Sequence, residues 1–311
     1  MGGVAVSFTG GKDSVLALHL AALNISLDTE AVDEALNALR AAAAAAAAGS
    51  GCGTTAAACS TISLLVTFAP AGHDRPGQGF KAHPIPVIRA QARALGIPHI
   101  VCEVDPLQSP LEEYMRHMRM LHQQHGITEL VTGDILDVAG RFMQRAVKGT
   151  GVTLVTPLWQ LPRSKVLAAL HALGIDSMIS CINVSKYGAA TTAVPGLLRI
   201  EPEARAATGG TIGEAAAAAA AGGWDAVVLL LGQRVTPELV AGPLAEAQQL
   251  FGADLGGELG EYHTLVLRAP LFSQPVKLAI LEVVRSGDYA YVMLDVPTAQ
   301  DPDGIIVTRT L

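Results

Sequence analysis

The chain begins with a pattern that strongly limits its fold, because a short apolar run breaks at two glycines and a helix-forming stretch follows at once. The run is Val4 to Phe8, the break is Thr9 to Ser14 (TGGKDS), and a helix is expected over Val15 to Leu23. A strand that turns through glycines into a helix presents backbone N–H groups and the positive helix end to an anion, and Lys12 adds a positive charge. This segment is predicted to bind phosphate.

The segment does not match a Walker A loop, which needs Gly where Val6 stands and Ser or Thr where Asp13 stands. It resembles instead the S-G-G-x-D-S loop of the PP-loop ATP pyrophosphatases, with Thr9 in place of the first Ser. In that superfamily the loop holds the β,γ-pyrophosphate of ATP while a nucleophile attacks the α-phosphorus, so the products are AMP and pyrophosphate. A plain glycine turn is the alternative interpretation, and the six-residue match favours the nucleotide site.

Composition limits the class of protein. The 311 residues are enough for two domains with separate cores. Half of the chain is hydrophobic, but much of that share is alanine, and no run reaches the roughly 18 to 20 large apolar residues of a membrane span. The first residues lack the pattern of a signal peptide. We therefore expect a cytoplasmic protein that does not associate with membranes.

The cysteines and the net charge argue against an RNA-modifying enzyme. Cys52, Cys59, Cys102 and Cys181 form no C-x-x-C pair and no zinc-site spacing with histidine. The tRNA-thiolating branch of the PP-loop enzymes usually relies on catalytic or metal-binding cysteines. The formal net charge is −7, whereas a nucleic-acid-binding face carries a basic surplus. We expect no direct nucleic-acid partner, although a local basic patch stays open.

Strand and helix patterns alternate after the opening motif. Ser109, Pro110 and Glu112 predict an N-cap, a first-turn proline and a capping-box acid for one of these helices. The expected elements are a strand over Ile62 to Phe68, a helix over Val87 to Leu95, a strand over His99 to Val104 and a helix that ends at Gly126. Such alternation predicts an α/β fold with a doubly wound parallel sheet.

In a sheet of this kind ligands bind beyond the carboxyl ends of the strands. Gly133 and Asp134 follow the apolar stretch Leu130-Val131 at such an end. Asp134, together with Asp13, is a candidate to hold Mg²⁺ or the nucleotide, and Gly133 permits close approach of the backbone to a ligand. An ordinary turn aspartate is an equally good interpretation of Asp134.

Further motifs occur along the chain in a fixed order. They are Ala82-His83, Gln91-Ala92 with Leu95 to Pro98, Gly133 to Ile135, Arg141 and Arg145, Pro157 to Trp159, Asp254, Gly257-Glu258, Gly260 to Thr264 and Pro270 to Phe272. This series resembles the diphthine ammonia ligase family of PP-loop enzymes, also called the diphthamide synthase domain family, over nearly the whole chain apart from the alanine-rich tracts. The resemblance implies a Rossmann-like fold of the adenine nucleotide alpha hydrolase type. It also implies ATP and Mg²⁺ as cofactors, ammonium as co-substrate and diphthine-modified elongation factor 2 as protein substrate.

The loop pattern and the resemblance together indicate the site residues. The expected nucleotide-binding residues are Thr9, Gly10, Gly11, Lys12, Asp13, Ser14, Gly133 and Asp134, with Asp13 and Asp134 as metal ligands. The expected catalytic residues are Lys12, Asp13, Glu258, Glu261 and His263. The expected substrate-binding residues are His83, Trp159, Glu258, Glu261, Tyr262, His263 and Thr264.

The acidic and aromatic residues of this set suit an amide-forming site. Ammonium needs carboxylates to hold it and a base to remove its proton, and histidine titrates in the right range. Trp159 or Tyr262 is a candidate to face the trimethylammonium group of diphthine. The alternatives are a polar turn followed by an ordinary strand and, for Trp159, a place in the core.

The domain boundary is predicted after Trp159. Residues 1–159 would form the PP-loop ATP-binding domain, and 160–311 a smaller α/β substrate-binding domain. In the second domain a helix is expected over Ser164 to Leu173, and strands over Met178 to Val184, Thr264 to Leu267, Ala290 to Val296 and Gly304 to Thr308. Alanine-rich tracts at about 38–61 and 204–222 are expected to be partly helical excursions without site residues.

Several departures from the family pattern affect the substrate. Gly256 stands where the family usually has Cys, and Leu259 where a small or polar residue is common. Diphthamide-forming members carry an acidic segment where this chain has Leu111 to Met118 with two acids, and they tend to have Glu where His263 stands. These traits resemble the bacterial-type branch. We expect ATP-dependent C–N ligation; another acceptor carboxylate, a non-catalytic ATP-binding regulator and an RNA-modifying enzyme stay open, as does assembly into a homo-oligomer.

Overall fold

The computed structural model describes residues 2–27, 37, 61–73, 82–187 and 226–297. The chain divides into two compact units, of which the first comprises Met1–Ile175 and Arg268–Pro275 and the second Asp176–Leu267 and Val276–Leu311. The boundary predicted after Trp159 falls one helix before this division. Apart from Thr61, the alanine-rich tracts lie outside the described residues, as does the strand expected over 304–308.

A five-stranded parallel sheet forms the centre of the first unit. Its strands are β1 (Gly3–Ser7), β2 (Leu64–Pro70), β3 (His99–Val104), β4 (Ile127–Val131) and β5 (Thr153–Val155). Their order across the sheet is β3-β2-β1-β4-β5, and every neighbouring pair is parallel. The predicted α/β fold with a parallel sheet is confirmed. Because the chain passes from β3 back to the other side of β1, the topological switch point lies between β1 and β4.

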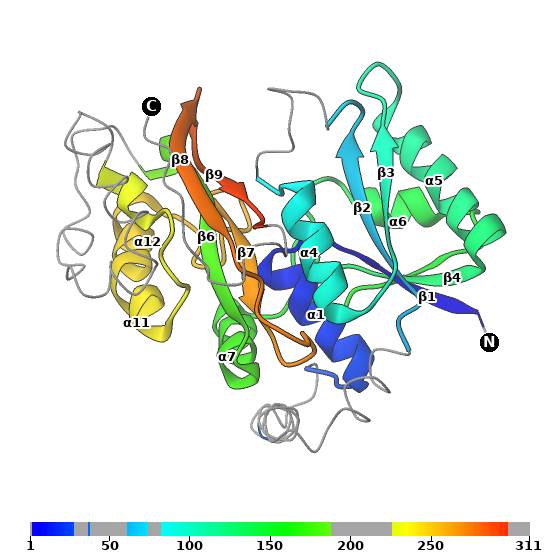
Figure 1. Ribbon diagram of the computed structural model, residues 1–311, viewed down its shortest axis with the longest axis horizontal. Coiled ribbons are helices and arrows are strands. Elements are labelled where there is room, and N and C mark those ends of the chain that lie inside the picture. Colours follow the sequence, from blue (N-terminus) through cyan, green and yellow to red (C-terminus); the bar gives the residue numbers. More distant parts are fainter. Residues whose placement is uncertain (1, 28–36, 38–60, 74–81, 188–225, 298–311) are drawn as a thin grey trace. The chain divides into compact units, whose positions relative to one another are not determined.

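Helices cover both faces of this sheet. They are α1 (Lys12–Leu23), α4 (Ile85–Leu95), α5 (Pro110–His125), α6 (Phe142–Val147) and α7 (Arg163–Leu173). Figure 1 shows α5 and α6 on one face of the sheet, with α1 and α4 on the other. Met118 and Leu121 of α5 are fully buried and pack with Leu64 and Leu130 of the sheet, so this face of the helix lies in the core. Burial of such side chains stabilises the layers by roughly 1.5 to 3 kcal/mol each.

The helix ends follow the sequence closely, with one exception at the start of α5. Gly96, Gly126 and Gly174 end α4, α5 and α7 in the left-handed conformation, as glycine allows. Ser109 stands at the N-cap of α5, but its side chain makes no capping bond. The carboxylate of Glu113 instead accepts the N–H of Asp105, at 3.2 Å. The capping box predicted from Ser109 and Glu112 is therefore absent.

The second unit contains a separate four-stranded sheet in the order β7-β6-β9-β8. Its strands are β6 (Asp176–Asn183), β7 (Tyr262–Arg268), β8 (Ala279–Ser286) and β9 (Tyr289–Asp295). The β6–β9 and β8–β9 pairs are antiparallel. The other elements are α11 (Pro237–Leu239), α12 (Ala245–Phe251), 3₁₀ turns η1 (Val184–Tyr187) and η2 (Ala226–Leu230), and the π-helical turn η3 (Val240–Leu244). None of the helices in the described part of the chain has the length and apolar character of a membrane span.

Candidate functional site

The segment Thr9 to Ser14, here called the glycine loop, joins the central strand β1 to α1. Gly10 has a φ of +72°, and a Cβ at this position would lie 2.1 Å from the side-chain oxygen of Gln91. Gly11 is the N-cap of α1, so no side chain caps the helix. The Thr9 hydroxyl donates to Ser14 Oγ at 3.2 Å, and Ser14 Oγ donates to the carbonyl of Gly11 at 3.0 Å. These bonds fix the shape of the loop, in which both glycines are buried. A glycine-rich turn that leads from a strand into the start of a helix is the type of local structure that binds phosphate in other proteins.

Lys12 and Asp13 form a partly buried ion pair in this loop. Lys12 Nζ lies 2.6 Å from Asp13 Oδ2, and the lysine side chain is only 4% exposed. The other carboxylate oxygen, Asp13 Oδ1, is buried and accepts no hydrogen bond from the described residues. Buried carboxylate oxygens are nearly always satisfied by a donor or a cation. The orphaned oxygen therefore fits a hard cation such as Mg²⁺ beside bound phosphates.

The end of β4 packs directly against the glycine loop. A Cβ at Gly133 would lie 2.7 Å from the carbonyl carbon of Asp13 and 2.8 Å from the backbone nitrogen of Ser14. The next residue, Asp134, accepts a hydrogen bond from the Thr132 hydroxyl at 2.9 Å. Burial raises the pKa of Asp134, and this hydrogen bond offsets part of the increase. The structure thus brings together the two predicted nucleotide-binding segments at the switch point of the sheet.

A metal ion bound between the glycine loop and the end of β4 would need some ligands that the protein does not supply. Within the described parts of the chain, no group of three or more His, Cys, Asp or Glu side chains is placed to hold an ion. Mg²⁺ commonly uses one or two carboxylates and completes its shell with phosphates and water. The acids predicted as ligands, Asp13 and Asp134, suit that mode of binding rather than a cage made by the protein alone.

Three polar side chains form hydrogen bonds to backbone carbonyl groups of the glycine loop or of Phe8, the residue before it. His83, predicted to bind substrate, has Nδ1 3.1 Å from the carbonyl oxygen of Thr9. Gln91 is fully buried in α4 and donates to the carbonyl of Gly10 at 2.9 Å. Thr67 of β2 donates to the carbonyl of Phe8 at 2.6 Å. No role was predicted for Gln91 or Thr67, whose only signal in the sequence is a polar residue among the apolar residues of a helix or strand.

Aromatic side chains lie near Asp134. Tyr114 of α5 stacks on Phe68 with ring centroids 4.3 Å apart and meets Phe142 edge-on at 4.9 Å. Burial, with smaller contributions from the charges of Asp134 and Cys102, raises the pKa of Tyr114 to about 12. Trp159, predicted to bind substrate, is half-buried in the turn after β5, and its backbone N–H donates to the carbonyl of Thr156. The described contacts do not join Trp159 to this aromatic cluster.

In the second unit, residues Asp254 to Tyr262 form a loop that we call the acidic turn. Glu261 is 2% exposed, and its two oxygens accept the N–H groups of Asp254 at 3.0 Å and Leu259 at 2.9 Å. Asp254 accepts the N–H of Gly256 at 2.7 Å. Glu261, predicted to be catalytic, thus fixes the shape of the turn.

The other predicted residues of this region differ in exposure. Tyr262 is buried and donates its hydroxyl to the carbonyl of Leu255 at 2.6 Å, so its polar end is used within the turn. Thr264 is also buried, in β7. Glu258 and His263 are half-buried. These two predicted site residues are therefore partly accessible to solvent, unlike Glu261, Tyr262 and Thr264.

The two described cysteines are buried free thiols. Burial raises the pKa of Cys102 and of Cys181 to about 12. At neutral pH both side chains stay protonated and therefore make poor nucleophiles. Neither suits a sulfur relay; Cys52 and Cys59 lie outside the described residues.

Fold and loop together define a class of protein: an α/β protein with a helix-flanked parallel sheet and a glycine-rich strand-to-helix turn at its switch point. Comparison of the chain with protein-family models gives no match, and comparison with curated proteins gives none either. Any functional assignment therefore depends on the geometry and chemistry of the two sets of residues described above.

Proposed function

We propose that this protein is an ATP-dependent amide ligase of the PP-loop type. It would adenylate a carboxylate, transfer ammonia to it, and release AMP and pyrophosphate. The main support is the position of the glycine loop at the switch point, where Gly133 packs against the backbone of Asp13 and Ser14. A side chain at position 133 would clash with that backbone, so glycine is what lets the two strand ends approach closely enough to flank one anionic ligand.

In this proposal each site residue of the first unit has its own role. Gly10, Gly11 and the start of α1 offer backbone N–H groups to the phosphates. Lys12 supplies a positive charge, which Asp13 holds in place at 2.6 Å. Asp13 and Asp134 are the acids that would hold Mg²⁺, whose charge would stabilise the phosphates during the transfer. The aromatic ring of Tyr114, which packs with Phe68 and Phe142, would shield the side of Asp134 from water.

The acceptor chemistry belongs to the second unit. A carboxylate is needed to hold ammonium and a base to take its proton, and half-buried Glu258 and His263 suit these roles. Glu261 is a positioning residue, because its oxygens hold the N–H groups of Asp254 and Leu259. Diphthine on elongation factor 2 is the first acceptor to test, and another carboxylate is the alternative.

The test is analysis of products from ATP, ammonium and diphthine-bearing elongation factor 2 by mass spectrometry. The expected result is AMP, pyrophosphate and the mass shift of amidation on the factor. Lys12→Ala should abolish AMP formation, whereas Lys148→Ala, which removes an exposed lysine after α6, should leave it unchanged. Turnover that survives Lys12→Ala would reject the role of the glycine loop.

Features of the acidic turn favour a second function. Both oxygens of Glu261 are used structurally, and Gly256 and Leu259 depart from the pattern of the amide-forming family. A chain of this kind would bind ATP as a regulator without turnover. Tight ATP binding that depends on Lys12, without AMP from any tested carboxylate, would support this alternative.

A further inference from the structure

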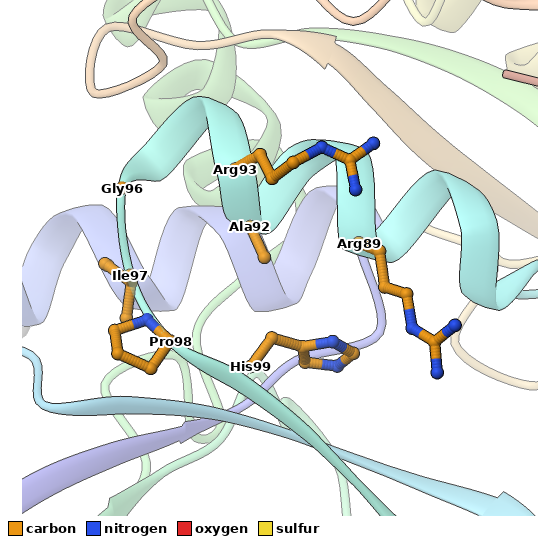
Figure 2. Close-up of a pocket in the computed structure, with 7 residues that line it drawn as sticks. All are labelled: Arg89, Ala92, Arg93, Gly96, Ile97, Pro98 and His99. Atoms are coloured by element: carbon orange, nitrogen blue, oxygen red, sulfur yellow. The ribbon is translucent and has the colours of Figure 1, made fainter. Parts of the chain in front are cut away.

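A hollow of about 540 Å³ opens in the first unit, where α4 turns into β3. This volume is in the usual range for small-molecule sites. In Figure 2 the side chain of Arg93 runs along the upper side of α4, that of Arg89 runs downward from the helix, and the ring of His99 lies beneath the helix. The lining residues are Arg89, Ala92, Arg93, Gly96, Ile97, Pro98 and His99.

The hollow carries positive charge without acidic partners. Arg89 and Arg93 lie one helical turn apart on α4, and both are exposed. Over the described stretches of the chain, neither guanidinium has a carboxylate within ion-pair distance, and no acid lines the hollow. Two neighbouring guanidinium groups repel one another, so an anion between them would be stabilised by both.

His99 gives the hollow a defined acceptor. Thr67 uses its hydroxyl proton to bind the carbonyl of Phe8 at 2.6 Å, so its oxygen must accept from His99 Nε2–H at 2.8 Å. The Nδ1 atom of this tautomer carries no proton. Burial, together with the charge of Arg89, lowers the pKa of His99 to about 4, so the ring is neutral at neutral pH. The ring can therefore accept a hydrogen bond from a ligand hydroxyl.

We propose that this hollow is a binding site for a small molecule that carries an oxyanion beside a hydroxyl group. The guanidinium groups of Arg89 and Arg93 would bind the oxyanion, because their forked N–H groups match phosphate and carboxylate oxygens. The hydroxyl would donate to His99 Nδ1. The buried side chains of Ala92 and Ile97 supply the apolar wall. None of the residues that line the hollow belongs to the glycine loop, although Thr67, which bonds His99, also bonds the carbonyl of Phe8 just before that loop.

The site is tested by NMR on the ¹⁵N-labelled full chain, with the arginine Nε–H signals as readout. The probes are inorganic phosphate, glycerol 3-phosphate and citrate. We expect saturable shifts at Arg89 and Arg93, with glycerol 3-phosphate binding more tightly than phosphate if phosphate is the natural oxyanion. Tighter binding of citrate would identify a hydroxy carboxylate instead. Shifts that stay linear for all three probes would reject the site, and equal affinity for phosphate and glycerol 3-phosphate would reject the role of His99.

A pair of double variants separates the site from a general charge effect. Arg89→Gln with Arg93→Gln should weaken binding of the best probe roughly tenfold or more, as expected when charge-assisted hydrogen bonds are lost. Arg119→Gln with Lys148→Gln removes the same charge from exposed positions of the same unit and should leave the affinity unchanged. Equal weakening in both would overturn the proposal. Unchanged circular dichroism in each variant checks the fold.

Discussion

The backbone N–H of Leu271 donates a hydrogen bond to Nε2 of His19, at 3.2 Å. The other ring nitrogen, Nδ1, donates to the carbonyl of Val15 at 2.8 Å. The imidazole is fully buried and both of its nitrogens are used, so its tautomer is fixed. This contact ties the segment Arg268–Pro275 to α1 within the first unit. The Pro270-Leu271-Phe272 motif therefore has a structural role near the start of the chain.

The buried imidazole of His19 predicts a loss of stability in acid. Burial lowers its pKa from the ordinary 6.5 to about 4, although the bond to Val15 partly opposes the shift. Below pH 6.5 the unfolded chain takes up a proton that the folded chain refuses, so the free energy of unfolding falls as the pH drops toward 4. His19 alone should account for roughly 3 kcal/mol across that window. His99, with a pKa of about 4, acts in the same direction.

Urea unfolding as a function of pH measures this effect. In His19→Gln the free energy of unfolding should depend less steeply on pH, with a slope that corresponds to up to one proton fewer taken up on unfolding. His125→Gln, which changes an exposed histidine at the end of α5, should keep the slope of the parent chain. An unchanged slope in His19→Gln would show that other groups cause the acid sensitivity.

Gly133→Ala should destabilise the first unit and disturb the glycine loop. The added methyl group would lie 2.7 Å from the carbonyl carbon of Asp13, and backbone there cannot move aside cheaply. Overpacking of this kind costs about 1 to 3 kcal/mol. ATP affinity and thermal unfolding are the measurements. Gly242→Ala is the control, because a Cβ there meets nothing within 4 Å. Full ATP affinity in Gly133→Ala would contradict the close approach of β4 to the loop.

Glu261→Gln should unfold the acidic turn more easily without removing a solvent-facing charge. An amide can accept only one of the two N–H groups, from Asp254 and Leu259, that the carboxylate now accepts. An unsatisfied buried donor costs about 1 to 3 kcal/mol. Hydrogen exchange of the Leu259 amide should become faster. Glu258→Gln, at a half-buried position, should keep that protection but lower ligation. The opposite pattern would exchange the roles assigned to the two glutamates.

Thr67→Val should weaken the support of the glycine loop. The valine keeps the shape but leaves the carbonyl of Phe8 and Nε2–H of His99 without the hydroxyl that now bonds both. We expect a loss of about 1 to 3 kcal/mol in the free energy of unfolding. Thr67→Ser, which retains the hydroxyl, should recover most of it. If serine and valine have the same effect, packing of the methyl group matters instead of the hydrogen bonds.

Much of the fold is readable from local patterns in the sequence. The strand expected over His99 to Val104 has those bounds in β3, and the helix stopped by Gly126 ends there. Several elements were not expected, among them α6, β5, β8 and α12, and the capping box that was predicted at Ser109 does not form. Antiparallel β8 depends on pairing with β9, and a pairing partner is not visible in the pattern of one strand.

The candidate site likewise has parts that the sequence predicts and parts that only the tertiary structure reveals. By itself the sequence determined the chemistry available in the glycine loop, because residue type and spacing fix which groups can meet an anion. Only the tertiary structure decided that Gly133 packs on Asp13, that Leu271 bonds His19 and that Glu261 holds the acidic turn. Helices and strands follow from periodicities between near neighbours, whereas these contacts join segments whose separation along the chain carries no local signal. Strand order and burial select such contacts, and both depend on the whole fold.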